Sequence, residues 1–179
     1  MTYIPLKRDS TTNAALTIDY QHHEIHDGDH FFIEQVVDIS INNVYDIQWT
    51  TPNTTKWEHF VLELNCSAET LWYIYEGATI LTAGTAKPTF NNNRNSIKTS
   101  TATLAVIANT TLANANLDTA VAGATEIAHG ITGAGRTGGN TIRDREIILK
   151  QNTIYCIRFI ATAAGYVNYF MSWYEHTNV

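Results

Sequence analysis

The residues best suited to chemistry are four histidines and their acidic neighbours near the start of the chain. The stretch reads His22-His23-Glu24-Ile25-His26-Asp27-Gly28-Asp29-His30. If residues 21–26 are extended, then His22, Glu24 and His26 share one face of a strand, at steps of about 6.8 Å. Imidazole nitrogens and carboxylate oxygens both bind zinc, so these three side chains are candidate metal ligands.

A zinc site of this kind would need a further ligand. His30, His59, His129 or a residue of a neighbouring subunit could supply it. The alternative is that the histidines form hydrogen bonds with backbone and water at the edge of a loop-rich sandwich. We favour this alternative, so the sequence assigns neither a metal ion nor a cofactor.

Other catalytic and nucleotide-binding signatures are weak. A G-x-G-x-x-G match begins at Gly133, and an overlapping phosphate-loop pattern has Arg136 where the lysine belongs. Both motifs need a following helix whose N-terminal amides hold the phosphate, and residues 141–148 read as a strand instead. No G-x-S-x-G nucleophile elbow is present, and the acidic pairs resemble ordinary strand and turn residues. We therefore expect a protein that is not an enzyme.

Composition narrows the possible partners. The chain has 179 residues, which favours one domain, and a net charge of −6 without a basic run, which argues against nucleic acid. No apolar run approaches the roughly 20 residues that span a bilayer, so a membrane is not an expected partner. No export signal is visible, so folding in a cytoplasm is expected, with Cys66 and Cys156 as buried thiols.

Period-two alternation of apolar residues dominates the chain and predicts half-buried strands. The first strand has two exceptions to the alternation: Gln35 lies on its apolar side and Val36 on its polar side. No segment shows a convincing helical period. The sequence thus predicts an all-β, antiparallel, jelly-roll-like β-sandwich of eight or nine strands. The expected strands cover residues 31–40, 44–50, 58–64, 71–75, 101–107, 145–150, 153–161 and 166–175.

Two regions lack this alternation. Residues 1–20 are predicted to be an N-terminal arm or edge strand, ahead of a single sandwich domain at 21–179. Residues 108–144 are predicted to be a long Gly-rich loop, because six of the ten glycines lie between Gly123 and Gly139. Short connections are expected at 150–152 and 163–165.

Six short segments, taken in order, resemble a family of tailed-bacteriophage virion proteins. None is specific alone, but their order is persuasive from about residue 20 to the C-terminus. They are His22-His23-Glu24-Ile25-His26-x-Gly28, Thr51 to Trp57 with His59, Tyr75-Glu76-Gly77, Asn93-Arg94-Asn95-Ser96, Glu146 to Thr153 with Tyr155, and Trp173-Tyr174-Glu175-His176.

This resemblance implies a head-decoration, or cement, protein. Such proteins are jelly-roll modules that bind the outside of a capsid, often as trimers, and the role implies no catalytic residues. The expected partner is the major capsid protein of the same virion, and the expected location is the capsid surface, after synthesis in the host cytoplasm. The candidate contacts with capsid or subunit are His22, His23, His26, Asn93, Arg94, Asn95, Arg136 and Arg143.

Two other functions remain open. The first is a receptor- or carbohydrate-binding module of a phage fibre or tail, which would need some of Trp49, Trp57, Trp72 and Trp173 on an exposed face. The second is a metal-dependent enzyme of the cupin type. That family's His-x-His spacing is missing here, which makes it remote.

Overall fold

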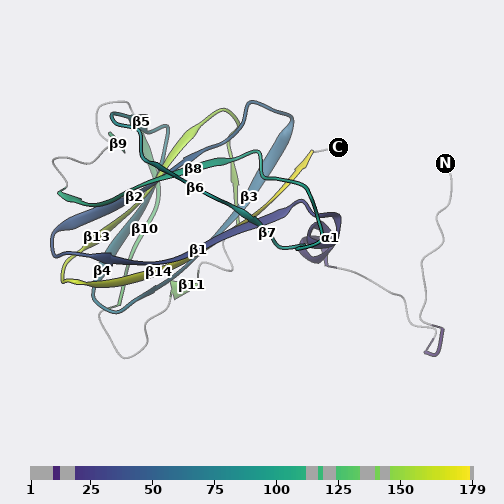
Figure 1. Ribbon diagram of the computed structural model, residues 1–179, viewed down its shortest axis with the longest axis horizontal. Helices are drawn as coiled ribbons and strands as arrows, with labels where there is room; N and C mark the ends of the chain where they lie inside the picture. Colours follow the sequence, from purple (N-terminus) through teal and green to yellow (C-terminus); the bar gives the residue numbers. More distant parts are fainter. Residues whose placement is uncertain are drawn as a thin grey trace.

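Two antiparallel β-sheets face each other in the computed structural model, and one short helix lies at one end of them (Figure 1). The structure describes residues 10–12, 19–111, 117–118, 124–133, 140–141 and 146–177. The predicted all-β sandwich is confirmed.

Most strands belong to one of two six-stranded sheets, here called sheet I and sheet II. Sheet I contains β7 (Phe90–Asn91), β1 (His30–Ile39), β14 (Gly165–Thr177), β3 (Lys56–Cys66), β12 (Ile147–Leu149) and β11 (Asn140–Thr141). Sheet II contains β10 (Thr125–Thr132), β4 (Thr70–Glu76), β13 (Ile154–Ala161), β2 (Asn43–Thr50), β8 (Thr103–Thr111) and β6 (Thr85–Lys87). A separate pair joins β5 (Thr79–Ile80) to β9 (Leu117–Asp118).

The strand pairing is that of a jelly roll. Eight strands in chain order are β1, β2, β3, β4, β10, β12, β13 and β14. Successive strands lie in opposite sheets except β4 and β10, which both belong to sheet II. The first pairs with the last (β1 with β14), then β2 with β13, β3 with β12 and β4 with β10. The short connections at 151–153 and 162–164 therefore pass from one sheet to the other and do not close hairpins.

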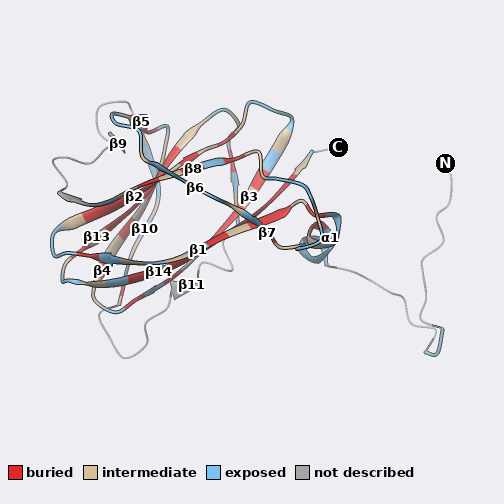
Figure 2. Ribbon diagram, viewed as in Figure 1, coloured by how far each residue is buried: buried red, intermediate tan, exposed pale blue. Residues whose placement is uncertain are grey.

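The core lies between the sheets, where the alternation predicted it. The inward row of β2 (Tyr45, Ile47, Trp49) is at most 2% exposed, and β3, β13 and β14 present matching rows (Figure 2). The two exceptions on β1, Gln35 and Val36, also point to the faces that the alternation predicts. Gln35 points inward and accepts a hydrogen bond from Tyr169 Oη at 3.4 Å, while Val36 is 65% exposed. Alternate side chains of a strand point to opposite faces, so the sequence pattern maps directly onto burial.

Cysteine and tryptophan positions support the same core. Cys66 and Cys156 are free thiols and buried, as predicted. Three tryptophans are buried, whereas Trp57 is 38% exposed. Trp49 packs edge-to-face on Trp173, with ring centroids 4.5 Å apart. The three buried tryptophans therefore contribute mainly to the packing of the core.

Two predictions about local structure are wrong. Residues 20–27 form a helix, α1 (Tyr20–Asp27), where an extended segment and no helix were expected. Gly28 ends it with φ +77°, and the amides of Gly28 and Asp29 bond to the carbonyls of Ile25 and Glu24, a C-cap that favours glycine. The second error is β10, an eight-residue strand within the stretch that was expected to be loop.

Other predictions fall on residues outside the described ranges. These include most of the N-terminal arm, the glycine-rich residues 134–139, and the candidate contacts Arg136 and Arg143. Among the described residues, no helix has both the length and the apolar character needed to cross a membrane.

Candidate functional site at the helix end

One end of the sandwich gathers most of the polar structure. We call it the helix end: β1, β3, β8 and β13 begin there, β2, β4 and β14 end there, and α1 lies beside it (Figure 1). Antiparallel register brings these strand termini together although they are far apart in the sequence.

Helix α1 is held by an asparagine-rich loop. Asn91 Nδ2 donates to the carbonyl of Gly28 at 2.7 Å, and Asn93 Nδ2 donates to that of His26 at 3.0 Å. Asn91 Oδ1 also accepts from the amide of Asn93 at 2.8 Å. The candidate contacts on α1 and on the loop are therefore neighbours in space. Of these, His22, His23, His26, Arg94 and Asn95 are exposed, and Asn93 is half-buried.

Replacing Asn91 by alanine is expected to loosen α1. The substitution leaves the Gly28 carbonyl and the Asn93 amide without their partner, which costs about 1–3 kcal/mol. Chemical denaturation would give the loss, and hydrogen exchange would show whether amides at 23–29 lose protection. Asn95→Ala, an exposed change in the same loop, is the control. Equal exchange in the two variants would contradict the anchoring role.

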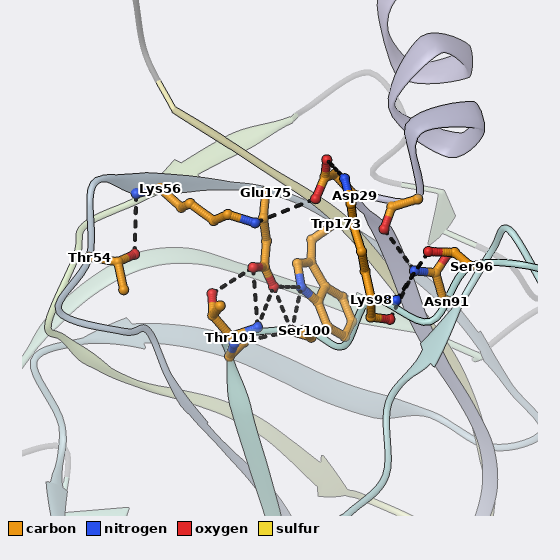
Figure 3. Close-up of polar contacts among 12 residues, drawn as sticks. Asp29, Thr54, Lys56, Asn91, Ser96, Lys98, Ser100, Thr101, Trp173 and Glu175 are labelled. Atoms are coloured by element: carbon orange, nitrogen blue, oxygen red, sulfur yellow. Dashed lines mark hydrogen bonds and ion pairs between the residues drawn. The ribbon is translucent and has the colours of Figure 1, made fainter.

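Asp29, directly after the helix, joins three segments. Lys98 Nζ lies 2.6 Å from Asp29 Oδ2, and Lys56 Nζ lies 3.4 Å from Oδ1 (Figure 3). The Asp29 carbonyl accepts from the amide of Glu175 at 2.9 Å. The carboxylate thus links α1 to the start of β3 and to the 96–100 loop.

Glu175 is buried at 1% exposure and well satisfied. Its carboxylate accepts from Ser100 Oγ at 2.6 Å, from the Thr101 amide at 2.9 Å and from Thr101 Oγ1 at 2.5 Å, with Trp173 Nε1 at 3.2 Å (Figure 3). Several donors around a buried carboxylate offset its loss of water. This carboxylate therefore secures the loop before β8 to the end of β14.

Glu58 stands opposite Glu175 in the β3–β14 register and is equally buried. Trp49 Nε1 donates to Glu58 Oε2 at 2.6 Å, while Oε1 has no hydrogen-bond partner among the described residues. Burial raises the pKa of Glu58 to about 8, and the nearby Glu175 adds to the rise against the opposing Trp49 bond. Glu58 is therefore protonated at neutral pH.

A cluster of aromatic and imidazole rings covers the outer face of sheet I at this end. His59 Nδ1 lies 2.5 Å from Glu146 Oε1, which also accepts from Tyr174 Oη at 2.8 Å. The Tyr174 ring stacks on His59 with centroids 4.3 Å apart, and His176 Nε2 lies 2.7 Å from His59 Nε2. Tyr20 of α1 packs edge-on against Tyr174 and His176.

Beside this cluster, a cleft of about 450 Å³ separates α1 from sheet I. His30 lies in its wall, between Gln21 Nε2 at 3.1 Å and Asn92 Nδ2 at 2.6 Å. Burial lowers the pKa of His30 to about 4, so this imidazole is neutral near pH 7. Apolar Ile25 and Phe170 and acidic Glu63 and Glu146 also line the cleft.

The remaining motif segments join the same end. Lys150 Nζ lies 2.5 Å from Glu76 Oε1, and Tyr155 Oη donates to Glu76 Oε2 at 2.9 Å. Thr51 Oγ1 donates to the Lys150 carbonyl at 2.7 Å. All six sequence segments of the predicted motif set are therefore linked at the helix end.

The three candidate metal ligands, His22, Glu24 and His26, do not come together. In an α-helix successive residues turn by about 100°, so Glu24 cannot share a face with both His22 and His26. Glu24 is buried, whereas His22 and His26 lie one turn apart on the exposed side with their Nε2 atoms 3.0 Å apart. Within the described part of the chain, no group of three or more His, Cys, Asp and Glu side chains could hold an ion.

The cluster around His59 was missed by sequence reasoning. His59 was named as a possible extra zinc ligand and as part of a motif, and Glu146 and His176 only as members of motifs. Glu146 and His176 lie 87 and 117 positions from His59 in the sequence. Only the strand register could reveal these contacts.

Two apolar side chains stand out on the surface here. Ile97, in the loop beyond Ser96, is 96% exposed. Trp57 lines a shallow groove of about 440 Å³ together with Ile148 and Gln151. Single exposed apolar side chains are common on protein surfaces, so what distinguishes Ile97 is its position in the loop that holds α1.

Comparison with known proteins adds no identification: no family model, no curated protein and no solved structure matches the chain.

Proposed function

We propose that this protein is a non-enzymatic decoration protein that binds the outside of a phage capsid and stabilises it. One observation carries the proposal: the six motif segments that resemble such proteins converge on the helix end. Their buried members, such as Thr51 and Glu175, stabilise this end from within, while the exposed histidines and Arg94 face outward beside Ile97.

The helix end suits a docking role because α1 and the 91–98 loop are held in place by internal contacts and also expose polar, charged and apolar side chains. Ion pairs and asparagine bonds fix α1 and the 91–98 loop to each other, and Asp29 joins them to β3 and β14. A surface that is ordered before binding loses little conformational entropy on docking. The partner is then the major capsid protein, with Ile97 as an apolar anchor among polar contacts.

Self-association would strengthen such docking. A capsid repeats the same surface around symmetry axes, and a symmetric oligomer can engage several copies at once. We favour a trimer, in keeping with the resemblance. Sedimentation of the purified protein would test this, and a monomer at all concentrations would count against it.

The direct test uses capsids of the same virion that lack this protein. Added protein is expected to co-sediment with them and to raise the temperature at which they break. Ile97→Asp is expected to weaken binding at least tenfold, because a charge replaces the apolar anchor. Leu81→Asp is the matched control, since Leu81 is 61% exposed and follows β5, which lies far from α1 (Figure 1).

Unchanged capsid stability after addition of the protein would reject the proposed function. Equal weakening by Ile97→Asp and Leu81→Asp would reject the helix end as the docking surface.

The second candidate is a carbohydrate- or receptor-binding module of a fibre or tail. The exposed ring of Trp57 over its groove is the observation that favours it, because sugars stack on exposed aromatic faces. Glycan binding that is lost in Trp57→Ala, without capsid binding, would support this candidate over the first.

A further inference from the structure

Two histidines on neighbouring strands of sheet I face each other at close range. His59 of β3 and His176 of β14 lie on the outer face at the helix end, with their Nε2 atoms 2.7 Å apart. The His59 side chain is only 11% exposed, and His176 is half-buried.

The other nitrogen of each ring is already assigned by its partner. His59 Nδ1 lies 2.5 Å from the carboxylate of Glu146, and His176 Nδ1 lies 3.3 Å from the backbone carbonyl oxygen of Thr177. Both partners can only accept, so each Nδ1 carries the ring hydrogen. If both imidazoles are neutral, each has one such hydrogen, and each Nε2 then presents a lone pair to the other. Two lone pairs at 2.7 Å repel each other unless a proton or a metal ion is shared between them.

We propose that His59 and His176 bind one divalent transition-metal ion of the zinc class through their Nε2 atoms. Imidazole nitrogen selects zinc, nickel and copper over magnesium and calcium. Two nitrogens at about 2.0–2.1 Å from an ion stand about 2.9 Å apart at a right angle and about 3.3 Å apart at a tetrahedral angle. The two rings reach either geometry by a shift of a few tenths of an ångström.

Glu146 supports this assignment as a positioning residue. Metal-binding histidines commonly donate their second N–H to a carboxylate, which fixes the tautomer and makes the ligand nitrogen more basic. Glu146 has this relation to His59, and Tyr174 Oη holds the same carboxylate oxygen at 2.8 Å. Tyr174 also stacks on the His59 ring and limits its rotation. Two protein ligands leave the remaining coordination positions to water.

The exposed histidine pair on α1 provides a matched control within the same chain. His22 and His26 have a similar nitrogen separation of 3.0 Å but lie on the solvent side of the helix. Alanine at either position favours the helix, so their replacement leaves the fold intact.

The test is calorimetric titration of the whole chain with zinc sulfate at pH 7.5, with cobalt absorption as a second readout of nitrogen ligation. We expect one ion per chain. His176→Ala is expected to weaken binding at least tenfold, and Glu146→Gln by about 10–100-fold, as for other carboxylate partners of metal-binding histidines. The double variant His22→Ala/His26→Ala is expected to bind like the parent chain.

Thermal melting of each variant without metal separates a folding defect from a binding defect, and Glu146 is exposed enough for its replacement to be tolerated. Failure of the parent chain to bind zinc and cobalt would overturn the proposal and would indicate an extra proton shared by the two rings. Binding lost in the His22/His26 variant but kept in His176→Ala would assign the ion to α1 instead. This site does not depend on the proposed capsid function.

Discussion

Asp46→Ala is expected to lower the free energy of unfolding by about 3–5 kcal/mol, the largest effect of a single substitution that we predict. Asp46 lies on β2 and is fully buried, and Arg158 lies opposite on β13 at 5% exposure. Arg158 Nε and Nη2 each donate to one Asp46 oxygen at 2.7 Å. Removing the carboxylate takes its anionic partner away from a buried guanidinium, which costs far more than the pair itself contributes.

Thermal melting and urea denaturation would measure the loss, which corresponds to a fall in Tm of roughly 10 °C for a chain of this size. The double variant Asp46→Leu/Arg158→Met should recover most of the stability, because an apolar pair of similar volume carries no desolvation cost. Lys150→Ala is the control: it breaks an ion pair with Glu76 whose lysine is 70% exposed, so its cost should stay below about 1 kcal/mol. Similar losses in Asp46→Ala and Lys150→Ala would show that the buried pair contributes no more to the free energy of unfolding than the exposed pair does.

Glu58→Gln is expected to make the protein more stable than the parent chain at alkaline pH. Burial raises the pKa of Glu58 to about 8 from an ordinary value near 4.5. The folded state therefore holds a proton that the unfolded state releases as pH rises above about 4.5. Stability falls through this window by at most about 1.4 kcal/mol per pH unit and levels off above pH 8. Glutamine does not ionise, and its side-chain oxygen can still accept from Trp49 Nε1.

Denaturation curves between pH 5 and pH 9 would test this. The stability of Glu58→Gln minus that of the parent chain should rise steadily across that range and be largest at pH 9. Glu34→Gln, an exposed change on β1, is the matched control. If the Glu58→Gln and parent profiles run parallel, the carboxyl is not protonated in the folded protein.

His30 should oppose this trend at the acidic end. Its pKa is lowered to about 4 by burial, so the unfolded state takes up a proton between about pH 6.5 and pH 4 that the folded state does not. Stability is therefore lost as pH falls through that window. The parent protein should accordingly be most stable at mildly acidic to neutral pH.

Much of the fold could be predicted from local pattern. The eight predicted strand ranges correspond to β1, β2, β3, β4, β8, β12, β13 and β14, because inward rows such as Phe60, Leu62 and Leu64 repeat every second residue. Strand β10 could not be predicted in this way. Its burial runs from exposed to half-buried for most of its length, so it carries no clear apolar row, and pairing with β4 establishes it as a strand.

The error at α1 has an identifiable cause. Alternating histidine and glutamate suggested a strand, and eight residues are too few to show a helical apolar stripe. A glycine directly after the segment, Gly28, was the available signal for a helix end. The helix depends on tertiary contacts, since Asn91 and Asn93 reach its last carbonyls from a loop more than sixty residues away.

The sequence by itself determined the fold class, the core rows and the buried thiols, because strand periodicity and burial are properties of neighbouring residues. Only the tertiary structure decided which polar residues meet. His59 contacts His176 because β3 pairs with β14 in one particular register, and it contacts Glu146 because β3 also pairs with β12. A shift of one residue would send these side chains to the opposite face. Long-range register is set by the packing of the whole core, and no short segment carries that information.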